Sequence, residues 1–578
     1  MSHIYGIDLG TTNSCIAWLE DGVPRVVSIE NSYIVPSVVS FDGDEVLVGQ
    51  RAANRAVAYP EDTVASIKRS MGTQTGIEVA GRILPPEEIS SYILRYLKHE
   101  AGKVVGEEIE RVVITVPAYF SDLQRRLTRK AGEMAGFKVE RIVNEPTAAA
   151  LFYDLTMPEG TRDDKNVLVY DLGGGTFDVS ILRMGELTEV LASTGNTALG
   201  GDDFDRVIVD KCLEKIREET GQELGTFRPA LVRLKMAAEK AKIVLSEKMD
   251  LSIEEDLLPV PQGDPVALKL NVSREDFETW IAPYLEQTAE EIETAMREAG
   301  MTADDIDQCI LVGGSTRIPA VISQVEGLFG ASRLPVVDPD LCVAKGAAVQ
   351  GGIISGEQCR QVLIDITAHS LGTEALVMGM EHNKTVVPII PRNTQIPVVR
   401  AKRFYTVAEN QEQIVSHVYQ GESSIPEENT MIGELDLALA PAEANCPIII
   451  EYSYDLDGII HVRIEQQGYG RVREVDFSAH KQGQSALELD FRDQEEILGP
   501  DDEDGEVLDI EPFEEMHQVT NYIVQKAKKV LESLSDEQHE TLENLLQEYA
   551  DALMTEDDDL VDETEDALVE YMDDLAEE

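Results

Sequence analysis

The fold of this chain is indicated most clearly by the stretch Val167-Leu-Val-Tyr-Asp171-Leu-Gly173-Gly174-Gly175-Thr176-Phe-Asp178. An apolar run typical of a buried strand ends in an aspartate, glycines turn the chain, and a second apolar run begins. The stretch Ile4-Tyr-Gly-Ile-Asp8-Leu-Gly10-Thr11-Thr12-Asn13-Ser14 follows the same plan. The recurrence indicates an internal duplication, with two strand-turn-strand units that face each other.

These two turns have the chemistry of a polyphosphate site. Glycine lets backbone N–H groups converge on an anion, because no Cβ atom blocks the approach. The threonine hydroxyls add donors, and Asp8 and Asp171 can each hold water on a Mg²⁺ ion. Either turn alone would fit an ordinary tight hairpin equally well, since glycine is common there. The matched pair favours a clamp that holds a polyphosphate from both sides.

A third glycine turn follows later, in Ile310-Leu-Val-Gly313-Gly314-Ser315-Thr316-Arg317-Ile-Pro319. A strand leads into two glycines and then into the start of a helix, so a flat base could pack against bare backbone. Alone this turn indicates little. After the other two turns, it predicts where the base of a nucleotide lies.

The pattern of apolar and charged residues changes twice along the chain. Residues 1 to about 360 alternate apolar strands with helical stretches, predicted at 121–135, 229–245 and 274–299, which is typical of an α/β architecture. From 362 to about 479, short β-branched runs between turns predict a compact β domain. From 480 onward, the chain has 34 acidic residues and only 5 basic ones. Apolar residues at helical spacing in this part predict a small helical hairpin or bundle.

Composition excludes several classes of function. The 578 residues include 109 acidic and 49 basic ones, a net charge of −60, which argues against binding to nucleic acid or anionic lipid. No apolar run approaches the roughly 18–20 residues of a membrane helix, and no signal peptide precedes Asp8, so we expect a cytoplasmic protein without a membrane partner. The six cysteines are scattered, which predicts reduced thiols rather than disulfides or a zinc site.

At this point the chain resembles a known family. The three turns, together with Val113-Ile-Thr-Val-Pro117-Ala-Tyr119-Phe, Asn144-Glu145-Pro146, Leu199-Gly200-Gly201-Asp202-Asp203 and Ala237-Ala-Glu239-Lys-Ala-Lys242, are similar to those of the seventy-kilodalton heat-shock chaperones, the DnaK-like family. Two features resemble the HscC-type branch most: the residues Ala118-Tyr-Phe-Ser-Asp and the short stretch 72–112. The resemblance implies an actin-like duplicated α/β ATPase domain at 1–360, a linker at 361–366, a β-sandwich peptide-binding domain at 367–479, and an acidic loop with a short helical lid-like tail at 480–578.

The resemblance also implies roles for single residues in the hydrolysis of ATP to ADP and phosphate, with Mg²⁺ and K⁺. Asp8 and Asp171 would surround the metal, Lys68 would lie near the γ-phosphate, and Glu145 would help to place the attacking water, which fits phosphoryl transfer by positioning and charge neutralisation. Asp171 and Thr176 are also implied as catalytic. The implied ATP-binding residues are Asp8, Gly10, Thr11, Thr12, Asn13, Gly173, Gly174, Gly175, Gly200, Gly201, Asp202, Glu239, Lys242, Ser246, Gly313, Gly314, Arg317 and Asp340.

The resemblance also implies which residues couple the ATPase domain to the β domain and which bind peptide. The apolar segment Val362-Leu363-Ile364-Asp365 would be the linker that docks on the ATPase domain when ATP is bound, although a buried strand is the ordinary interpretation of such a run. Pro117 and Arg125 match positions that relay the nucleotide state, and Arg141 and Asn144 match a J-domain contact surface. Ile414 would lie at the central pocket for an extended apolar peptide, with Leu376 and Ala408 at the arch over it. The implied partners are unfolded polypeptides, a J-domain co-chaperone and a nucleotide exchange factor.

Other functions are consistent with parts of the pattern. A specialised chaperone with one client or a regulatory role would have the same motifs. A metabolite kinase on the same duplicated ATPase fold would need a metabolite-binding domain and a catalytic base, rather than an apolar linker and a β domain. An actin-like filament protein would leave residues 362–578 unexplained.

Overall fold

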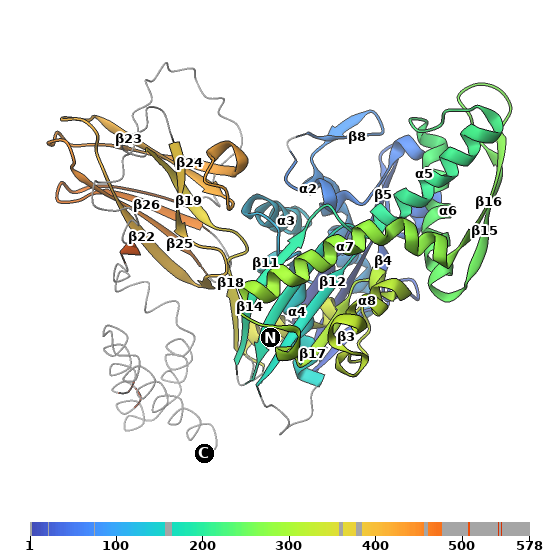
Figure 1. Ribbon diagram of the computed structural model, residues 1–578, viewed down its shortest axis with the longest axis horizontal. Helices are drawn as coiled ribbons and strands as arrows, with labels where there is room; N and C mark the ends of the chain where they lie inside the picture. Colours follow the sequence, from blue (N-terminus) through green and yellow to red (C-terminus); the bar gives the residue numbers. More distant parts are fainter. Residues whose placement is uncertain are drawn as a thin grey trace. The chain divides into compact units, whose positions relative to one another are not determined.

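The computed structural model describes residues 3–20, 22–73, 75–156, 164–185, 187–357, 362–376, 384–455, 460–476, 507–508, 542 and 545. The chain divides into two compact units (Figure 1). The first comprises Met1–His369 and Arg392–Gln395, and the second begins at Ser370. The predicted helices of the acidic tail fall almost entirely outside the described residues.

The first unit contains two sheets that repeat one topology. In the first sheet, β1 pairs antiparallel with β2 and parallel with β10. In the second, β12 pairs antiparallel with β13 and parallel with β17. Asp8 lies opposite Cys15 in one hairpin, and Asp171 lies opposite Asp178 in the other. The predicted duplication is therefore visible in the strand register, and each aspartate stands where its strand enters the glycine turn.

The first sheet has the strand order β11-β10-β1-β2-β3, and β4 pairs with β2. Its strands are β1 (Ile4–Leu9), β2 (Asn13–Glu20), β3 (Val23–Val26), β4 (Val35–Pro36), β10 (Arg111–Val116) and β11 (Lys138–Asn144). The second sheet has the order β17-β12-β13-β14-β18-β21. Its strands are β12 (Lys165–Leu172), β13 (Phe177–Met184), β14 (Leu187–Asn196), β17 (Gln308–Val312), β18 (Val362–Ile366) and β21 (Gln395–Ile396).

Two helices of small residues pack closely beside these sheets, namely α4 (Glu145–Thr156) and α9 (Cys342–Ser355). A Cβ atom at Gly346 of α9 would lie 1.6 Å from the carbonyl oxygen of Ala148 in α4. One at Gly6 of β1 would lie 2.2 Å from the backbone nitrogen of Ala348. Only glycine allows these backbones to approach so closely.

Each half of the first unit carries further elements. The first half adds β5 (Val38–Asp42), β6 (Glu45–Val48), α1 (Gln50–Arg55), η1 (Pro60–Asp62), β7 (Thr63–Ala65), η2 (Ile67–Ser70), β8 (Ile77–Val79), β9 (Arg82–Leu84), α2 (Pro86–Val105) and α3 (Asp122–Met134). The second half adds α5 (Gly201–Thr220), α6 (Arg228–Glu247), β15 (Asp250–Leu258), β16 (Val266–Ser273), α7 (Arg274–Glu298), η3 (Ala303–Asp305), η4 (Gly314–Arg317), α8 (Pro319–Phe329) and η5 (Ala331–Arg333). The three helices predicted from periodicity correspond to α3, α6 and α7.

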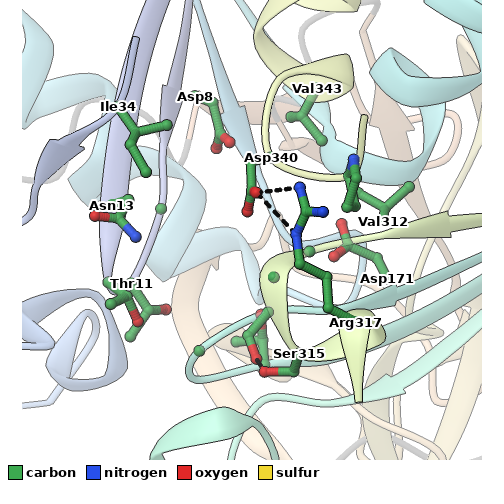
Figure 2. A pocket seen from close by; sticks show the side chains of 18 of the residues that line it. Asp8, Thr11, Asn13, Ile34, Asp171, Val312, Ser315, Arg317, Asp340 and Val343 are labelled. Atoms are coloured by element: carbon green, nitrogen blue, oxygen red, sulfur yellow. Dashed lines mark hydrogen bonds and ion pairs between the residues drawn. The ribbon is translucent and has the colours of Figure 1, made fainter. Parts of the chain in front are cut away.

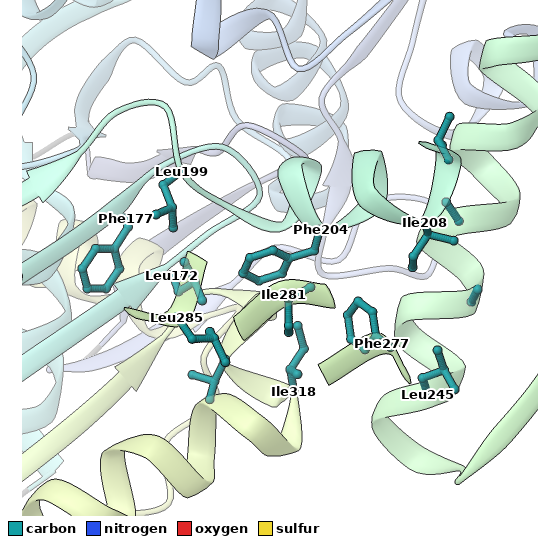
Figure 3. Packing of buried hydrophobic residues seen from close by; sticks show 14 of the residues in the cluster. Leu172, Phe177, Leu199, Phe204, Ile208, Leu245, Phe277, Ile281, Leu285 and Ile318 are labelled. Carbon is teal, nitrogen blue, oxygen red and sulfur yellow. The ribbon is translucent and has the colours of Figure 1, made fainter. Parts of the chain in front are cut away.

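The core of the second half joins α5, α6 and α7 to the sheet. Phe204 and Ile208 of α5 pack with Phe277 and Ile281 of α7, and Leu245 of α6 completes the group (Figure 3). All five side chains are buried. Burial of one such side chain stabilises a fold by about 1.5–3 kcal/mol, so this cluster fixes the helices that border the site.

The second unit is a β-sandwich, as predicted. One sheet has the order β20-β19-β23-β24, and the other has the order β27-β26-β25-β22-β28. Its strands are β19 (Leu371–Leu376), β20 (Lys384–Ile390), β22 (Val398–Tyr405), β23 (Gln413–Gln420), β24 (Thr430–Ala438), β25 (Pro447–Tyr454), β26 (Ile460–Gln466), β27 (Arg471–Asp476) and β28 (Val507–Leu508), and η6 (Pro426–Glu428) precedes β24. The inward faces form one apolar core.

Two general predictions can be compared with the described part of the chain. Within it, no helix is long and apolar enough to cross a membrane. Its cysteines are buried free thiols, at positions 15, 212, 309, 342 and 446.

Candidate functional site

The two glycine turns and the third turn line one cavity of about 650 Å³ in the first unit (Figure 2). Strand ends supply Asp8, Asp171 and Val312, and the turns supply their threonines and glycines. Predicted site residues on the cavity wall are Asp8, Gly10, Thr11, Thr12, Asn13, Lys68, Glu145, Asp171, Gly173, Gly174, Thr176, Glu239, Lys242, Ser246, Gly313, Gly314, Arg317 and Asp340. Residues far apart in the sequence therefore meet around one volume that suits a nucleotide.

The two turns meet with no room for larger side chains. A Cβ atom at Gly174 would lie 2.0 Å from Oγ1 of Thr12, so only glycine fits there. A Cβ atom at Gly175 would lie 2.7 Å from Cγ2 of Thr11. The close approach leaves bare backbone beside the threonine hydroxyls, as a phosphate clamp requires.

Four predicted ATP-binding residues stand behind this clamp and are not on the cavity wall: Gly175, Gly200, Gly201 and Asp202. The backbone N–H of Gly201 donates to the carbonyl of Gly173 at 3.0 Å, and that of Asp202 donates to the carbonyl of Gly174 at 2.7 Å. The side chain of Asp202 pairs with Lys235 at 3.0 Å. In this geometry, the start of α5 holds the second glycine turn in place.

Three buried carboxyl groups lie near the phosphate end. Burial and the charge of Glu145 raise the pKa of Asp8 to about 7 and also raise that of Asp178 to about 7. The same causes raise the pKa of Asp171 well above its usual range. Buried carboxylates that repel each other favour a cation between them. This donor set therefore fits Mg²⁺.

No group of three or more metal-ligating side chains occurs in the described part of the chain. A Mg²⁺ ion keeps several waters and is often held by only one or two carboxylates plus phosphate oxygens.

Lys68 and Glu145 form a buried ion pair at the same end of the cavity. Their side chains are 5% and 10% exposed, although the residues are 77 positions apart in the sequence. Lys68 is carried by η2, and Glu145 is the first residue of α4. The Lys68 ammonium also lies 5.8 Å from the centre of the Phe120 ring. The pair places one cation and one carboxylate beside the phosphate clamp.

The opposite end of the cavity suits a nucleoside. At Gly313, where φ is +82°, a Cβ atom would lie 2.4 Å from the carbonyl oxygen of Leu172. Arg317 pairs with Asp340 at 2.7 Å, and Figure 2 shows the two side chains together on the wall. Lys242 pairs with Asp205 at 2.9 Å. These contacts fix the charged groups of the wall while the backbone at Gly313 and Gly314 stays bare.

Sequence reasoning missed Asp178 and Ser315. Asp178 is 1% exposed and accepts a hydrogen bond from the backbone N–H of Tyr119 at 2.9 Å. Ser315 donates from its hydroxyl to the carbonyl of Gly173 at 2.9 Å, which ties the third turn to the second. The signal for Asp178 was present, because a carboxylate within the apolar run after the glycine turn is unusual in a buried strand.

The predicted linker forms strand β18, which extends the second sheet. Residues 362, 363 and 364 pair in parallel with residues 187, 188 and 189 of β14. Asp365 is partly buried, and the amide group of Asn144 donates to both of its carboxylate oxygens, at 3.0 and 3.1 Å. Burial raises the pKa of Asp365. The end of the linker is therefore bonded to β11 of the first sheet.

Arg125 connects that contact to the turn that follows Pro117. Its guanidinium donates to the side-chain oxygen of Asn144 at 2.6 Å and to the carbonyl of Ala118 at 2.8 Å. It also donates to the carbonyl of Phe120 at 3.2 Å. The predicted relay residues and Asn144 are thus joined in one network. Arg141 lies on the same strand, β11.

The predicted peptide-binding residues lie in the second unit. Ile414 is on β23 with 1% exposure, inside the sandwich core. Ala408 is exposed in the loop after β22, where its neighbour Val407 is a 37% exposed apolar side chain. Leu376 ends β19, and its side chain is outside the described residues. The peptide pocket stays a prediction.

Together, the duplicated sheets, the paired glycine turns and the buried carboxylates define an ATPase of the actin-like class, followed by a β-sandwich. The family model for the Hsp70 protein matches residues 4–578. The DnaK chaperone proteins of Thermotoga petrophila and Thermotoga maritima are each 42% identical over 479 residues, covering 81% of this chain and 79% of the relative. The chain belongs to the Hsp70 family and is a DnaK-like, ATP-dependent chaperone.

The predicted fold class, ATPase activity and chaperone function are thereby confirmed. As a family member, the protein binds ATP and ADP with Mg²⁺, and it binds unfolded polypeptides and co-chaperones. Nothing supports the kinase or the specialised single-client alternative. The likeness to the HscC-type branch stays a prediction.

Proposed function

We propose that this chaperone binds and releases extended apolar segments in a cycle that the linker couples to ATP hydrolysis. Residues 1–360 would form the ATPase domain, 361–366 the linker, 367–479 the peptide-binding domain, and 480–578 a lid-like tail. The observation that carries the proposal is the hydrogen-bonded network from Asp365 through Asn144 to Arg125. It joins the linker to the turn beside the catalytic carboxylates, so a change at one end has a physical route to the other.

Within the ATPase domain, we assign roles by position on the cavity wall. Asp8 and Asp171 would hold Mg²⁺ through water, and K⁺ would bind among the same carboxylates. The metal would neutralise charge on the phosphates. Lys68 would contact the γ-phosphate, and Glu145, held by Lys68, would orient the attacking water. The hydroxyl of Thr176 and the bare backbone of the two turns would bind the phosphate oxygens.

Within the β-sandwich, we propose that Leu376, Ala408 and Ile414 surround an extended apolar peptide. One buried leucine of a client contributes roughly 1.5–3 kcal/mol, so binding would be weak and tolerant of sequence. We assign Arg141 and Asn144 to the J-domain contact, and expect a nucleotide exchange factor and a cytoplasmic location. The bonding of Asn144 to Asp365 supports this assignment, because a partner at Asn144 would act directly on the linker.

The test is ATP turnover by the full chain, with and without a J-domain protein and an unfolded peptide. We expect stimulation by each. Asp365→Asn should weaken that stimulation, since an amide oxygen accepts less strongly from Asn144 than a carboxylate does and no longer attracts the charge of Arg125. Asp304→Asn, at an exposed position in η3, is the matched control. An absent response to peptide and to every J-domain protein tried would contradict the coupled cycle.

A further inference from the structure

His369, the last residue before the β-sandwich unit, lies against the turn that joins β10 to α3. Its imidazole packs on the ring of Tyr119 with 4.3 Å between ring centres and an angle of 60°. Its Nε2 atom lies 3.1 Å from the carbonyl oxygen of Tyr119. A carbonyl oxygen only accepts hydrogen bonds, so this contact requires Nε2 to carry a proton, which both the imidazolium and one neutral tautomer provide.

This contact completes the restraint of three successive carbonyl groups. Arg125 holds the carbonyls of Ala118 and Phe120, which flank Tyr119. The carbonyl of Tyr119 between them is held by His369. Arg125 acts from within the ATPase fold, whereas His369 arrives three residues after β18. The turn is therefore held both from within the ATPase fold and by the chain just beyond the linker.

The same residue of the turn also holds a buried carboxylate of the site. The backbone N–H of Tyr119 donates to Oδ1 of Asp178 at 2.9 Å. Asp178 lies opposite Asp171 in the β12–β13 hairpin and is affected by the charges of Glu145 and Lys68. A change in the orientation of Tyr119 therefore moves the hydrogen bond that orients Asp178, next to the groups that line the phosphate end.

We propose that His369 is a positioning residue for ATP hydrolysis, which acts on Asp178 through the backbone of Tyr119. The inference rests on ATP hydrolysis in the cavity described above, and it adds a residue that lies outside that cavity. When β18 and His369 are docked, both sides of Tyr119 are held and Asp178 has one orientation. When they leave, the carbonyl of Tyr119 loses the His369 contact, and the backbone N–H that orients Asp178 is held less firmly.

The test compares His369→Leu, which keeps apolar packing and removes the donor, with His369→Gln, which restores an N–H donor. Hydrolysis is measured in a single turnover of ATP by the full chain, and ATP affinity is measured separately. We expect His369→Leu to slow hydrolysis about three- to tenfold, the equivalent of one hydrogen bond, with ATP affinity within about twofold. His369→Gln should recover most of the rate. His99→Leu, at an exposed position of α2, should leave the rate unchanged.

A second readout follows the contact itself and needs no hydrolysis. The Tyr119 amide, bonded to Asp178, should exchange its hydrogen for deuterium faster in His369→Leu than in the parent chain, and at the parental rate in His369→Gln. The proposal is overturned if the Leu variant hydrolyses ATP and exchanges Tyr119 at parental rates. It is also overturned if His369→Gln is as slow as His369→Leu, because a structural role would not distinguish them by the donor. A parent chain that exchanges normally and fails to hydrolyse ATP would count instead against the proposed site.

Discussion

Arg228, the first residue of α6, forms an ion pair of 2.9 Å with Glu61 of η1. The same guanidinium donates to the carbonyl of Thr63 at 3.2 Å. These contacts join the two halves of the ATPase unit, whose glycine turns line the cavity from opposite sides. We expect a bound nucleotide to leave when those halves separate, so Arg228 should oppose its release.

Arg228→Ala should therefore speed the release of bound ADP. The pair is 39% and 66% exposed, and exposed pairs contribute at most about 1 kcal/mol, so we expect a two- to fourfold faster rate that varies with salt. Stopped-flow release of a fluorescent ADP analogue measures it. Lys215→Ala removes an equally simple surface pair with Glu219 inside α5 and should change nothing. Equal rates for the two variants would show that the bridge does not limit release.

Asp171→Asn should abolish hydrolysis and also stabilise the nucleotide-free protein. The folded pKa of Asp171 is raised by burial and by Glu145, so stability falls as pH rises from the unfolded value near 4 toward the higher folded value. If loss of this buried charge raises the free energy of unfolding by about 1 kcal/mol, Tm should rise by about 2–4 °C for a domain of 150–250 residues. Scanning calorimetry should show this gain at pH 7.5 and a smaller gain at pH 5, where protonation already relieves the parent chain. A lower Tm for the variant at pH 7.5 would contradict the raised pKa.

Lys68→Met should reduce both stability and hydrolysis. Removal of one partner leaves the Glu145 carboxylate buried without its cation, which costs about 3–5 kcal/mol. Lys68→Met combined with Glu145→Gln should recover most of the stability, because neither partner of the pair then leaves an unpaired buried charge, but none of the hydrolysis. Urea denaturation and single-turnover assays separate the two effects. If the double variant is no more stable than the single one, the pair does not account for the loss.

His417 should make the β-sandwich sensitive to pH. Its Nδ1 lies 2.9 Å from Glu374, which raises the pKa of His417 and lowers that of Glu374 to about 2. Because the histidine pKa is raised on folding, the stabilisation is complete below the unfolded value near 6.5 and is lost as pH rises through the folded value. The carboxylate contribution is present above the unfolded value near 4.5 and is lost as pH falls toward 2.

His417→Gln should therefore destabilise the sandwich by about 1 kcal/mol or less at pH 6 and by little at pH 9, because both groups are partly exposed. Urea denaturation at the two pH values measures this difference. His461→Gln, at another partly exposed histidine of the sandwich, provides the control. A loss that is equal at pH 6 and pH 9 would rule out the ion pair as its cause.

Local patterns in the sequence predicted much of this architecture. The glycine turns after Asp8 and Asp171 mark strand ends, because turn chemistry and apolar alternation act over a few residues. The same short range explains which contacts local patterns could not predict. Lys68 and Glu145 meet across 77 residues, and only the family resemblance connected them in advance. Likewise Tyr119 and His369 are 250 residues apart, and neither has a neighbour in the chain that indicates the contact.

Ile414 shows a different limit. An apolar residue alternating with polar ones on a strand predicts burial, and Ile414 is buried in the sandwich core. The pattern cannot distinguish a core residue from the floor of a peptide pocket, since both exclude water. For the acidic tail, periodicity predicted helices that lie outside the described residues.

The parallel pairing of β18 with β14 also affects how the chain meets other chains. When β18 leaves, residues 187–189 of β14 lose their hydrogen-bonding partners and present an open edge of the sheet. An open edge can template the addition of any extended segment, including one from a second molecule. In the proposed cycle, the docked linker would protect this edge of the ATPase unit against intermolecular strand addition, and each release of the linker would briefly remove that protection.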